Sequence, residues 1–252
     1  MKAIYILWPE KNYTPQERKE TLLSLCSSQL DLSLIQDLRV NIDDEFSQVK
    51  SPAPKFHRGP SIVATVSVKS NADVFGSIYN HLANAGFKVG CYTVEESIYT
   101  DYGDNQHFPA RNWADGNKTP SVVVAVTLLT RPKKFNHNEW IRRWHGIMSP
   151  GSEAIQPRAR YIRNVITKVE KDSPHIDGIV EESWPSAEHI SNPYKFYLAS
   201  NPFQLIWHMI KMLRLVTQFH QLHKIRTVTM SEYFLKTEDE TFTITGGDSL
   251  VK

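Results

Sequence analysis

The order of its apolar segments constrains what this chain can fold into more than any single motif does. Segments typical of strands and segments with helical spacing follow one another as strand, helix, strand, strand, helix, strand, and the same order then occurs again. The first six are expected at residues 2–8, 15–28, 32–42, 61–68, 72–85 and 87–99. The second six are expected at residues 122–129, 137–148, 160–169, 176–184, 186–198 and 225–235. A single sheet with both helices on one face accommodates each half, so the order predicts a diverged duplication, although residue identity between the halves is slight.

Local signals place several helix ends. The run from Thr14 to Glu17, with Pro15 at the first helical position, is typical of a helix start. Asn71 is the expected cap of the helix at 72–85, and Asn136 that of the helix at 137–148. Pro150 and the glycine after it are expected to end this second helix.

The helix at 137–148 carries the residues with the clearest chemical potential. Trp140 and Trp144 fall on its apolar stripe, and His145 lies at the edge of that stripe. An imidazole in this position is neither deep in a core nor fully in water, which suits a side chain that must meet a ligand. Imidazole also gives or takes a proton near neutral pH, so His145 is the first candidate for a general acid or base.

This stretch resembles the EthD family of the dimeric α+β barrel superfamily. The resemblance rests on a strand ending in Arg131, on Trp140 and the run Arg143-Trp144-His145, on Pro157 with the run 161–164, and on the run 177–184, and it covers residues 121–235. It implies a ferredoxin-like βαββαβ fold, two of which pack sheet to sheet into a barrel with a ligand cavity. Relatives carry out cofactor-free proton transfers, cyclisations and oxygenations, and some bind heme.

Together the element order and the resemblance predict an α+β fold of two tandem ferredoxin-like (βαββαβ) domains that form a dimeric α+β barrel within one chain. The N-terminal domain is expected at 1–119, the EthD-like domain at 120–236 and a partly mobile tail at 237–252. A polar linker, or loop over a cavity mouth, is expected at 102–119, and a further loop at 47–60. Residues 202–223 form an expected helical insertion, buried against the domain or a partner.

The predicted site combines three catalytic and three substrate-binding residues. With His145, Arg131 would fix a carboxylate or enolate, and Tyr161 would donate to a substrate oxygen. His137, Trp140 and Trp144 would line the substrate pocket. Each has a purely structural alternative: a helix-edge histidine bonded to a carbonyl, a surface salt bridge, core packing for the aromatic residues, and a solvated first-turn histidine.

Several classes of function are not indicated. With 29 basic and 27 acidic residues, the charge balance does not call for nucleic acid or an anionic membrane. The two distant cysteines form no redox or metal motif, and their reduced state together with the N-terminus predicts a cytoplasmic protein. His220 and His223, three apart on an expected helix, could share a metal-binding face but lack further ligands.

We therefore hypothesise a cofactor-free enzyme acting on a small, mostly apolar organic molecule, with no metal and possible homodimerisation. The alternative is a binding or assembly protein without catalysis, which includes a heme-binding protein.

Overall fold

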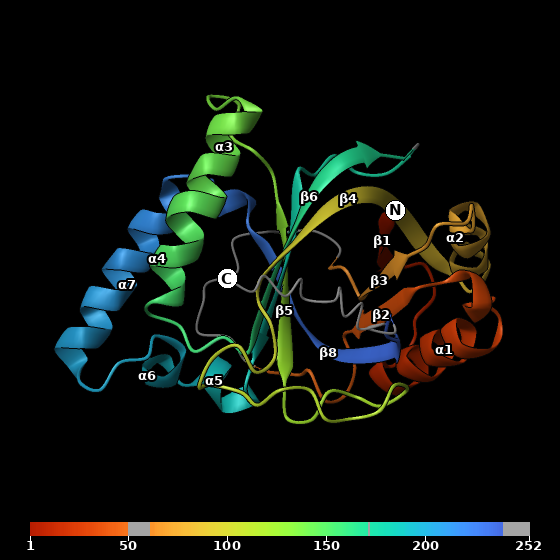
Figure 1. Cartoon of the computed structure of the whole chain (residues 1–252), viewed down its shortest axis with the longest axis horizontal. Helices are drawn as coiled ribbons and strands as arrows, with labels where there is room; N and C mark the ends of the chain where they lie inside the picture. Colours follow the sequence, from red (N-terminus) through yellow and green to blue (C-terminus); the bar gives the residue numbers. More distant parts are fainter. Residues whose placement is uncertain (50–60, 171, 239–252) are drawn as a thin grey trace, which may run out of the picture.

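Eight strands close into one antiparallel barrel in the computed structural model, which describes residues 1–49, 61–170 and 172–238 (Figure 1). The strands are β1 (Lys2–Pro9), β2 (Asp37–Ile42), β3 (Ala64–Lys69), β4 (Phe87–Thr100), β5 (Val123–Leu129), β6 (Arg160–Val169), β7 (Gly178–Trp184) and β8 (Arg226–Lys236). The predicted α+β barrel within one chain is thereby confirmed. The expected loop 47–60, for the most part, and nearly all of the expected tail lie outside the described residues.

The barrel is built from two sheets with the same internal order. The first runs β4-β1-β3-β2 and the second runs β8-β5-β7-β6. Antiparallel pairing of β2 with β8 and of β4 with β6 joins both pairs of edges. Closure leaves no unpaired edge among the eight described strands, and it places one face of each of them inside the barrel.

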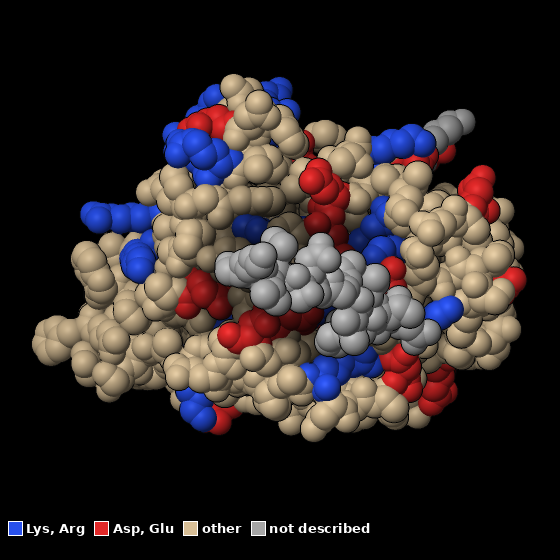
Figure 2. Space-filling model, in the orientation of Figure 1, with Lys and Arg blue, Asp and Glu red and all other residues tan. Residues whose placement is uncertain are grey.

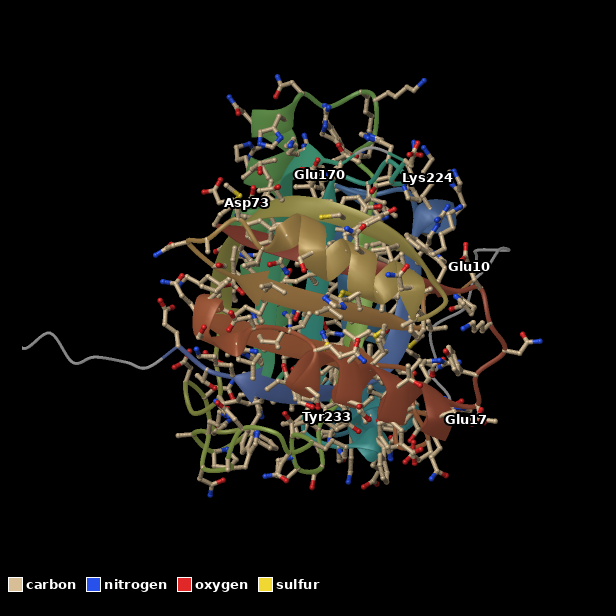
Figure 3. All side chains as sticks on the ribbon, turned by 90° about the vertical axis from the view of Figure 1, so that its right-hand side faces the viewer. Glu10, Glu17, Asp73, Glu170, Lys224 and Tyr233 are labelled. Atoms are coloured by element: carbon tan, nitrogen blue, oxygen red, sulfur yellow. The ribbon has the colours of Figure 1, made fainter. Side chains whose placement is uncertain are left out.

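Two helices cover the outside of the first sheet, α1 (Pro15–Ser28) and α2 (Phe75–Asn84), and both lie in front of it in Figure 3. The predicted start of α1 is confirmed: the Thr14 hydroxyl accepts from the Glu17 N–H, and the Glu17 carboxylate accepts from the Thr14 N–H. Alternate residues of β1, such as Tyr5 and Leu7, pack against the buried faces of both helices.

A longer helical segment than expected covers the second sheet. The Asn136 cap is confirmed, since its side-chain oxygen accepts from the Glu139 N–H at 2.9 Å. The segment comprises α3 (His137–Arg143), a widened π-helical turn η2 (Trp144–Met148) and α4 (Ser149–Glu153), so the predicted end before Pro150 is wrong. A proline lacks the N–H for a normal turn and its ring crowds the preceding turn, and the widened turn lets the helix continue past it.

Three further boundaries differ from the prediction for local reasons. The Asp31 side chain accepts from the Ser33 N–H and caps a short helix, η1 (Leu32–Leu34). The strand β2 therefore starts only at Asp37. Asn71 does not cap α2: the Ser70 hydroxyl accepts from the Ala72 N–H and delays the helix to Phe75. The expected helix at 186–198 is two short helices, α5 (Ala187–Ser191) and α6 (Pro193–Phe196), because a proline forces the preceding residue into an extended conformation.

The insertion contains one long helix, α7 (Pro202–Thr217), which lies beside α3 and α4 (Figure 1). The predicted shared helical face of His220 and His223 is wrong, because α7 ends at Thr217 and only a short helix η3 (Leu222–Lys224) follows. The His220 Nδ1 atom instead lies 3.0 Å from the Thr130 carbonyl oxygen.

Two kinds of side chain share the barrel interior. Ile4 and Ile6 of β1 belong to the same buried cluster as Val124 and Val126 of β5, a strand that is not a neighbour of β1, so this cluster spans the barrel. Polar residues occupy the remaining interior positions. Asn41 of β2 reaches Glu181 of β7 in the same way, across the barrel.

Candidate functional site

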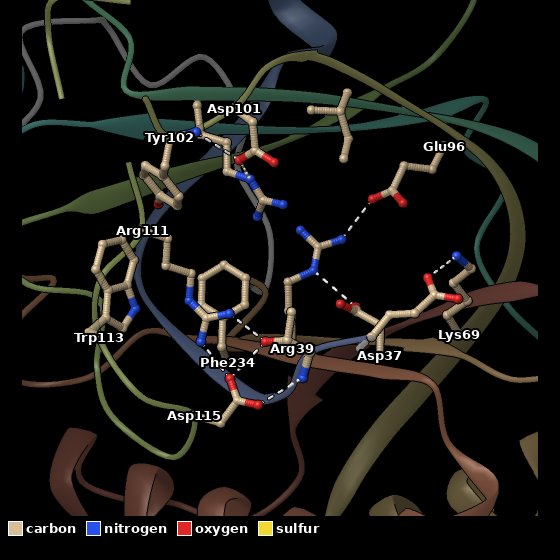
Figure 4. A pocket seen from close by; sticks show the side chains of 14 residues that line it. Asp37, Arg39, Lys69, Glu96, Asp101, Tyr102, Arg111, Trp113, Asp115 and Phe234 are labelled. Atoms are coloured by element: carbon tan, nitrogen blue, oxygen red, sulfur yellow. Dashed lines mark hydrogen bonds and ion pairs between the residues drawn. The ribbon is translucent and has the colours of Figure 1, made fainter. Parts of the chain in front are cut away.

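A pocket of ≈ 850 Å³ opens into the polar part of the barrel (Figure 4). Strand residues and the loop between β4 and β5 line it: Asp37, Arg39, Lys69, Glu96, Ile98, Asp101, Tyr102, Arg111, Trp113, Asp115, Arg160, Phe234, Thr237 and Glu238. Figure 2 shows acidic and basic side chains gathered around the middle of the face that is turned to the viewer. The pocket has the size of a small-molecule site, but its lining is far more charged than is usual for one.

Arg39 of β2 forms the centre of the pocket floor. Its Nε atom donates to Asp37 at 3.2 Å and its Nη2 atom to Glu96 at 2.7 Å. Glu96 also accepts from the Lys2 ammonium, which in turn donates to Asn164 at 3.2 Å. Arg39 and Lys2 are almost fully buried, so these contacts hold two cations in a place that only paired charges tolerate.

Glu181 of β7 links this floor to the deeper interior. Its Oε1 atom accepts from Asn164 at 3.1 Å and its Oε2 atom from Asn41 at 3.4 Å, while Arg39 Nη1 lies 3.9 Å from Oε2. The four side chains come from β2, β6 and β7, which closure brings together. The network therefore exists only in the closed barrel.

The network shifts the protonation of its members in different directions. Burial by itself would raise the pKa of Glu96, but the charges of Arg39 and Lys2 outweigh it and lower that pKa to about 2. Burial and repulsion by Arg39 lower the pKa of Lys2 to about 8. Burial also opposes the charge on Arg39, yet Asp37, Glu181 and Glu96 outweigh it and raise its pKa further. At neutral pH the floor thus carries a fixed guanidinium beside a lysine that gives up its proton more readily than usual.

One wall of the pocket is aromatic. Tyr102, Trp113 and Phe234 pack edge to face, with ring centroids 5.2–6.5 Å apart. The Tyr102 hydroxyl donates to Glu232 at 2.6 Å, and both burial and this carboxylate raise the Tyr102 pKa. Arg160 reaches the same carboxylate at 3.2 Å and Asp101 at 2.7 Å.

Some polar atoms of the floor are left without partners. Buried Arg39 Nη1, Ser67 Oγ and Asn41 Oδ1 make no hydrogen bond within residues 1–49, 61–170 and 172–238. Arg39 and Ser67 are opposite each other in the β2–β3 pairing. Buried polar groups are nearly always bonded, and of these three residues only Arg39 lines the pocket, so its Nη1 atom is the one that a ligand in the pocket could reach.

The six residues predicted from sequence lie elsewhere, around the helical layer outside the second sheet. Trp140 and Trp144 are fully buried between this layer and the sheet, in a cluster that includes Tyr161 and Phe219. Trp144 Nε1 donates to the Tyr161 hydroxyl at 3.1 Å. The structure thus brings these three aromatic residues together, and they fill the space between helix and strand.

His145 packs edge-on against the Trp144 ring at 4.8 Å between centroids, beside Arg163 of β6. Its Nε2 atom is buried and makes no hydrogen bond in the described part of the chain. Burial, and secondarily the Arg163 charge, lower its pKa to about 4. The imidazole is therefore neutral at physiological pH and able to accept a hydrogen bond or a proton.

The other two predicted residues lie near the start of α3. Arg131 lies in the loop that precedes α3. Its Nη1 atom donates to the Phe135 carbonyl oxygen in the same loop, and its Nε atom lies 3.8 Å from the Asp177 carboxylate. His137 is exposed in the first turn of α3. None of the six residues lines the pocket.

The pocket residues carried a signal in the sequence. Asp37-Leu38-Arg39-Val40-Asn41 alternates charged or amide residues with apolar ones, and Thr65-Val66-Ser67 alternates hydroxyl residues with an apolar one. In a strand this alternation places polar residues on one face. Since helices cover the other face, the polar face must turn into the barrel, a step that needs the barrel to be inferred first.

The fold and the pocket define a single-chain α+β barrel with a charged, partly aromatic binding pocket. The chain is similar to an anthrone oxidase-like protein of known crystal structure, with a TM-score of 0.55 and 9% identity over 94% of each chain. It is also similar to a mutant chlorite dismutase from Candidatus Nitrospira defluvii, with a TM-score of 0.43 and 7% identity over 93% of this chain and 91% of that one. The first likeness shows a shared fold and nothing of the activity, and the second is too distant to add to it.

No family model and no curated protein matches the sequence. Within the described residues, no group of three or more histidine, cysteine or acidic side chains is arranged to hold a metal ion. No helix in the same ranges has the length and apolar character needed to cross a membrane.

Proposed function

We propose that this protein binds a small organic molecule that combines a hydrogen-bond-accepting group, such as a carboxylate, with a planar apolar part. The observation that carries the proposal is the pairing of two buried arginines, Arg39 and Arg160, with an aromatic wall around one pocket. Guanidinium groups recognise carboxylates by paired hydrogen bonds, and aromatic side chains pack on planar ligands. This lining favours a more polar ligand than the mostly apolar one expected from the sequence.

The pocket offers hydrogen-bond donors to the acceptor group of such a ligand. Arg39 uses Nε and Nη2 for carboxylates of the protein, and Arg160 uses Nε and Nη1. The remaining Nη atom of each makes no hydrogen bond to the residues that the structure describes. A ligand oxygen near these atoms would gain charge-assisted hydrogen bonds, each worth about 1.5–3 kcal/mol.

Isothermal titration with benzoate and with its neutral analogue benzamide tests this proposal. Benzoate is expected to bind, and the variant Arg39→Lys, which retains the charge but loses the forked donor, is expected to bind it about tenfold more weakly. Trp113→Leu should also weaken the affinity for benzoate, because it removes one ring of the aromatic wall on which the ligand would pack. Arg142→Lys, an exposed arginine paired with Glu139, is the matched control and should bind as the wild type does.

Equal affinity for benzoate and benzamide would contradict a role for the arginines. Unchanged affinity for benzoate in both Arg39→Lys and Trp113→Leu would place binding outside this pocket. Melting temperatures of the variants separate loss of binding from loss of folding.

Catalysis through His145 is a second hypothesis, and it rests on the EthD resemblance together with the neutral, unpartnered imidazole described above. His145→Gln is expected to leave benzoate binding unchanged, because His145 does not line the pocket. A general acid or base must lie within hydrogen-bond reach of its substrate, so this hypothesis requires a substrate that binds beside His145 and outside the pocket. Loss of turnover of such a substrate in His145→Gln would support a catalytic role, shared with Arg131 and Tyr161.

Heme binding is the third hypothesis. It is supported by the imidazoles of His145 and His220, but Trp140, Trp144 and Phe219 occupy the space beside them. Heme would require these rings to move, so the hypothesis predicts a Soret band on addition of hemin and its loss in His145→Gln or His220→Gln.

We further propose that the halves 1–119 and 120–236 are diverged copies of one ferredoxin-like unit, and that the second is EthD-like. The identical strand order of the two sheets supports this proposal. The cytoplasmic location stays a prediction.

A further inference from the structure

The α7 helix exposes an apolar face to solvent. Phe203 is 86% exposed, Trp207 59% and Ile206 57%, and Met209, Ile210 and Leu213 are also exposed. In Figure 2 the lower left edge, where α7 begins in Figure 1, is tan, without acidic or basic side chains. Surface helices normally point such residues inward, so this face lacks a packing partner among the residues that the structure describes.

The opposite face of α7 is already packed against the protein. Leu215 is buried against Gly151 of α4, where an added Cβ would lie only 2.7 Å from a Leu215 methyl group. The His208 Nδ1 atom lies 2.6 Å from the Tyr197 carbonyl oxygen. Because the inward face is fixed by these contacts, the apolar residues cannot be buried by a rotation of the helix about its axis.

The spacing of the exposed residues indicates what covers them. Phe203, Ile206, Ile210 and Leu213 are separated by alternating steps of three and four, which is the spacing of the core positions of a helix pair. Trp207 and Met209 flank this stripe. A partner helix with the same spacing would fill the stripe, and α7 is itself such a helix.

The stripe is also symmetric about His208. A two-fold axis crossing α7 at the level of His208 sets Ile206 against Ile210 of the partner subunit and Phe203 against Leu213 of the partner subunit. The same axis sets Trp207 beside Trp207 of the partner subunit on one flank of the stripe, and Met209 beside Met209 of the partner subunit on the other flank. Such an antiparallel pairing is self-complementary, as two-fold symmetric interfaces must be.

The exposed area is compatible with a dimer. The six side chains expose on the order of 600 Å², so pairing would bury on the order of 1,200 Å² in total, the lower end for specific interfaces. We infer that two copies of this protein pair through α7, antiparallel, by the stripe Phe203, Ile206, Ile210 and Leu213. This inference does not depend on what the barrel pocket binds.

Sedimentation equilibrium of the full chain at micromolar concentrations tests the pairing. The wild type is expected to be a dimer and Ile210→Glu a monomer, because a carboxylate in the stripe would be buried against an apolar side chain. Gln218→Glu adds the same charge at the exposed residue that follows α7, outside the stripe, and should remain a dimer. The melting temperature of Ile210→Glu should be no lower than that of the wild type, when the wild type is measured at concentrations low enough to dissociate its dimer. This comparison shows that the substitution prevents pairing without unfolding the monomer.

Cysteine cross-linking tests the antiparallel geometry. A mixture of Ile206→Cys and Ile210→Cys should form a disulfide-linked pair under mild oxidation, and neither variant alone should do so to a similar extent. The native cysteines, Cys26 and Cys91, are buried and do not compete.

A wild-type monomer, or a dimer that persists in Ile210→Glu, would overturn the inference. So would a monomer that co-sediments with phosphatidylcholine vesicles through this face, since the occupant would then be a lipid surface. Self-linking of Ile206→Cys alone would overturn the antiparallel arrangement.

Discussion

Gly178, at the start of β7, allows the helical layer to approach the second sheet closely. A Cβ atom added there would lie 2.9 Å from Cζ3 of Trp144 and 3.2 Å from Cη2 of Trp140. Real Cβ contacts are almost never that short, so Gly178→Ala must displace one indole. Both rings are fully buried, with centroids 5.0 Å apart, and Trp144 is also held by its hydrogen bond to Tyr161.

Overpacking of this kind costs about 1–3 kcal/mol. For a chain of this size, such a loss lowers the melting temperature by roughly 2–4 °C per kcal/mol, so Gly178→Ala is expected to melt roughly 2–12 °C below the wild type. Calorimetry or circular dichroism measures the difference, and the near-ultraviolet spectrum should change because the environments of two tryptophans change.

Gly146→Ala is the matched control, because an added Cβ there meets no atom within 4 Å and the residue is exposed in the turn η2. It should melt at or slightly above the wild-type temperature, since alanine favours a helix over glycine by about 1 kcal/mol. An unchanged melting temperature in Gly178→Ala would refute the tight packing. It would then favour Trp140 and Trp144 as walls of an open pocket, the role expected for them from the sequence.

Two predictions concern protonation. The pKa of His145 is lowered to about 4, so its ring NMR signals should not titrate between about pH 5 and 8. The protein should also lose stability as pH falls from 6.5 towards 4, because the unfolded chain takes up this proton more readily than the folded one. A His145 titration midpoint near 6.5 would show that the imidazole is solvated. The low pKa of Glu96 contributes stability that is present above its ordinary pKa of 4.5 and lost as pH falls towards 2, so the melting temperature of Glu96→Gln should decline less than that of the wild type over this range. Parallel declines of the two proteins would refute the coupling of Glu96 to Arg39 and Lys2.

Local interactions explain which helix ends were predictable. The caps at Thr14 and Asn136 depend on residues within one turn, so the sequence identifies them. The delayed start of α2 depends on Ser70, which competes with Asn71 for the cap of the helix. The continuation of the helix through Pro150 depends on a widened turn, which competes with the tendency of a proline to end a helix. A single-residue signal does not decide such a competition.

The candidate site shows the opposite limit. His145 and the two tryptophans are conspicuous because they are rare residues near one another in the sequence. Arg39, Glu96 and Glu181 lie on β2, β4 and β7, far apart in the chain. Each of them, considered without the other two, would be predicted to be an exposed surface charge. Only closure through the β2–β8 and β4–β6 pairings turns them towards one another.

What the sequence by itself determined is the alternation of elements and the apolar face of each strand, because period and capping are properties of neighbouring residues. Only the tertiary structure decided which strand faces form the pocket, and that the apolar stripe of α7 remains exposed. Both follow from how distant segments pack: the barrel buries charged residues that can pair across it, and α7 has one face fixed by α4 while the other lacks a partner within the described chain.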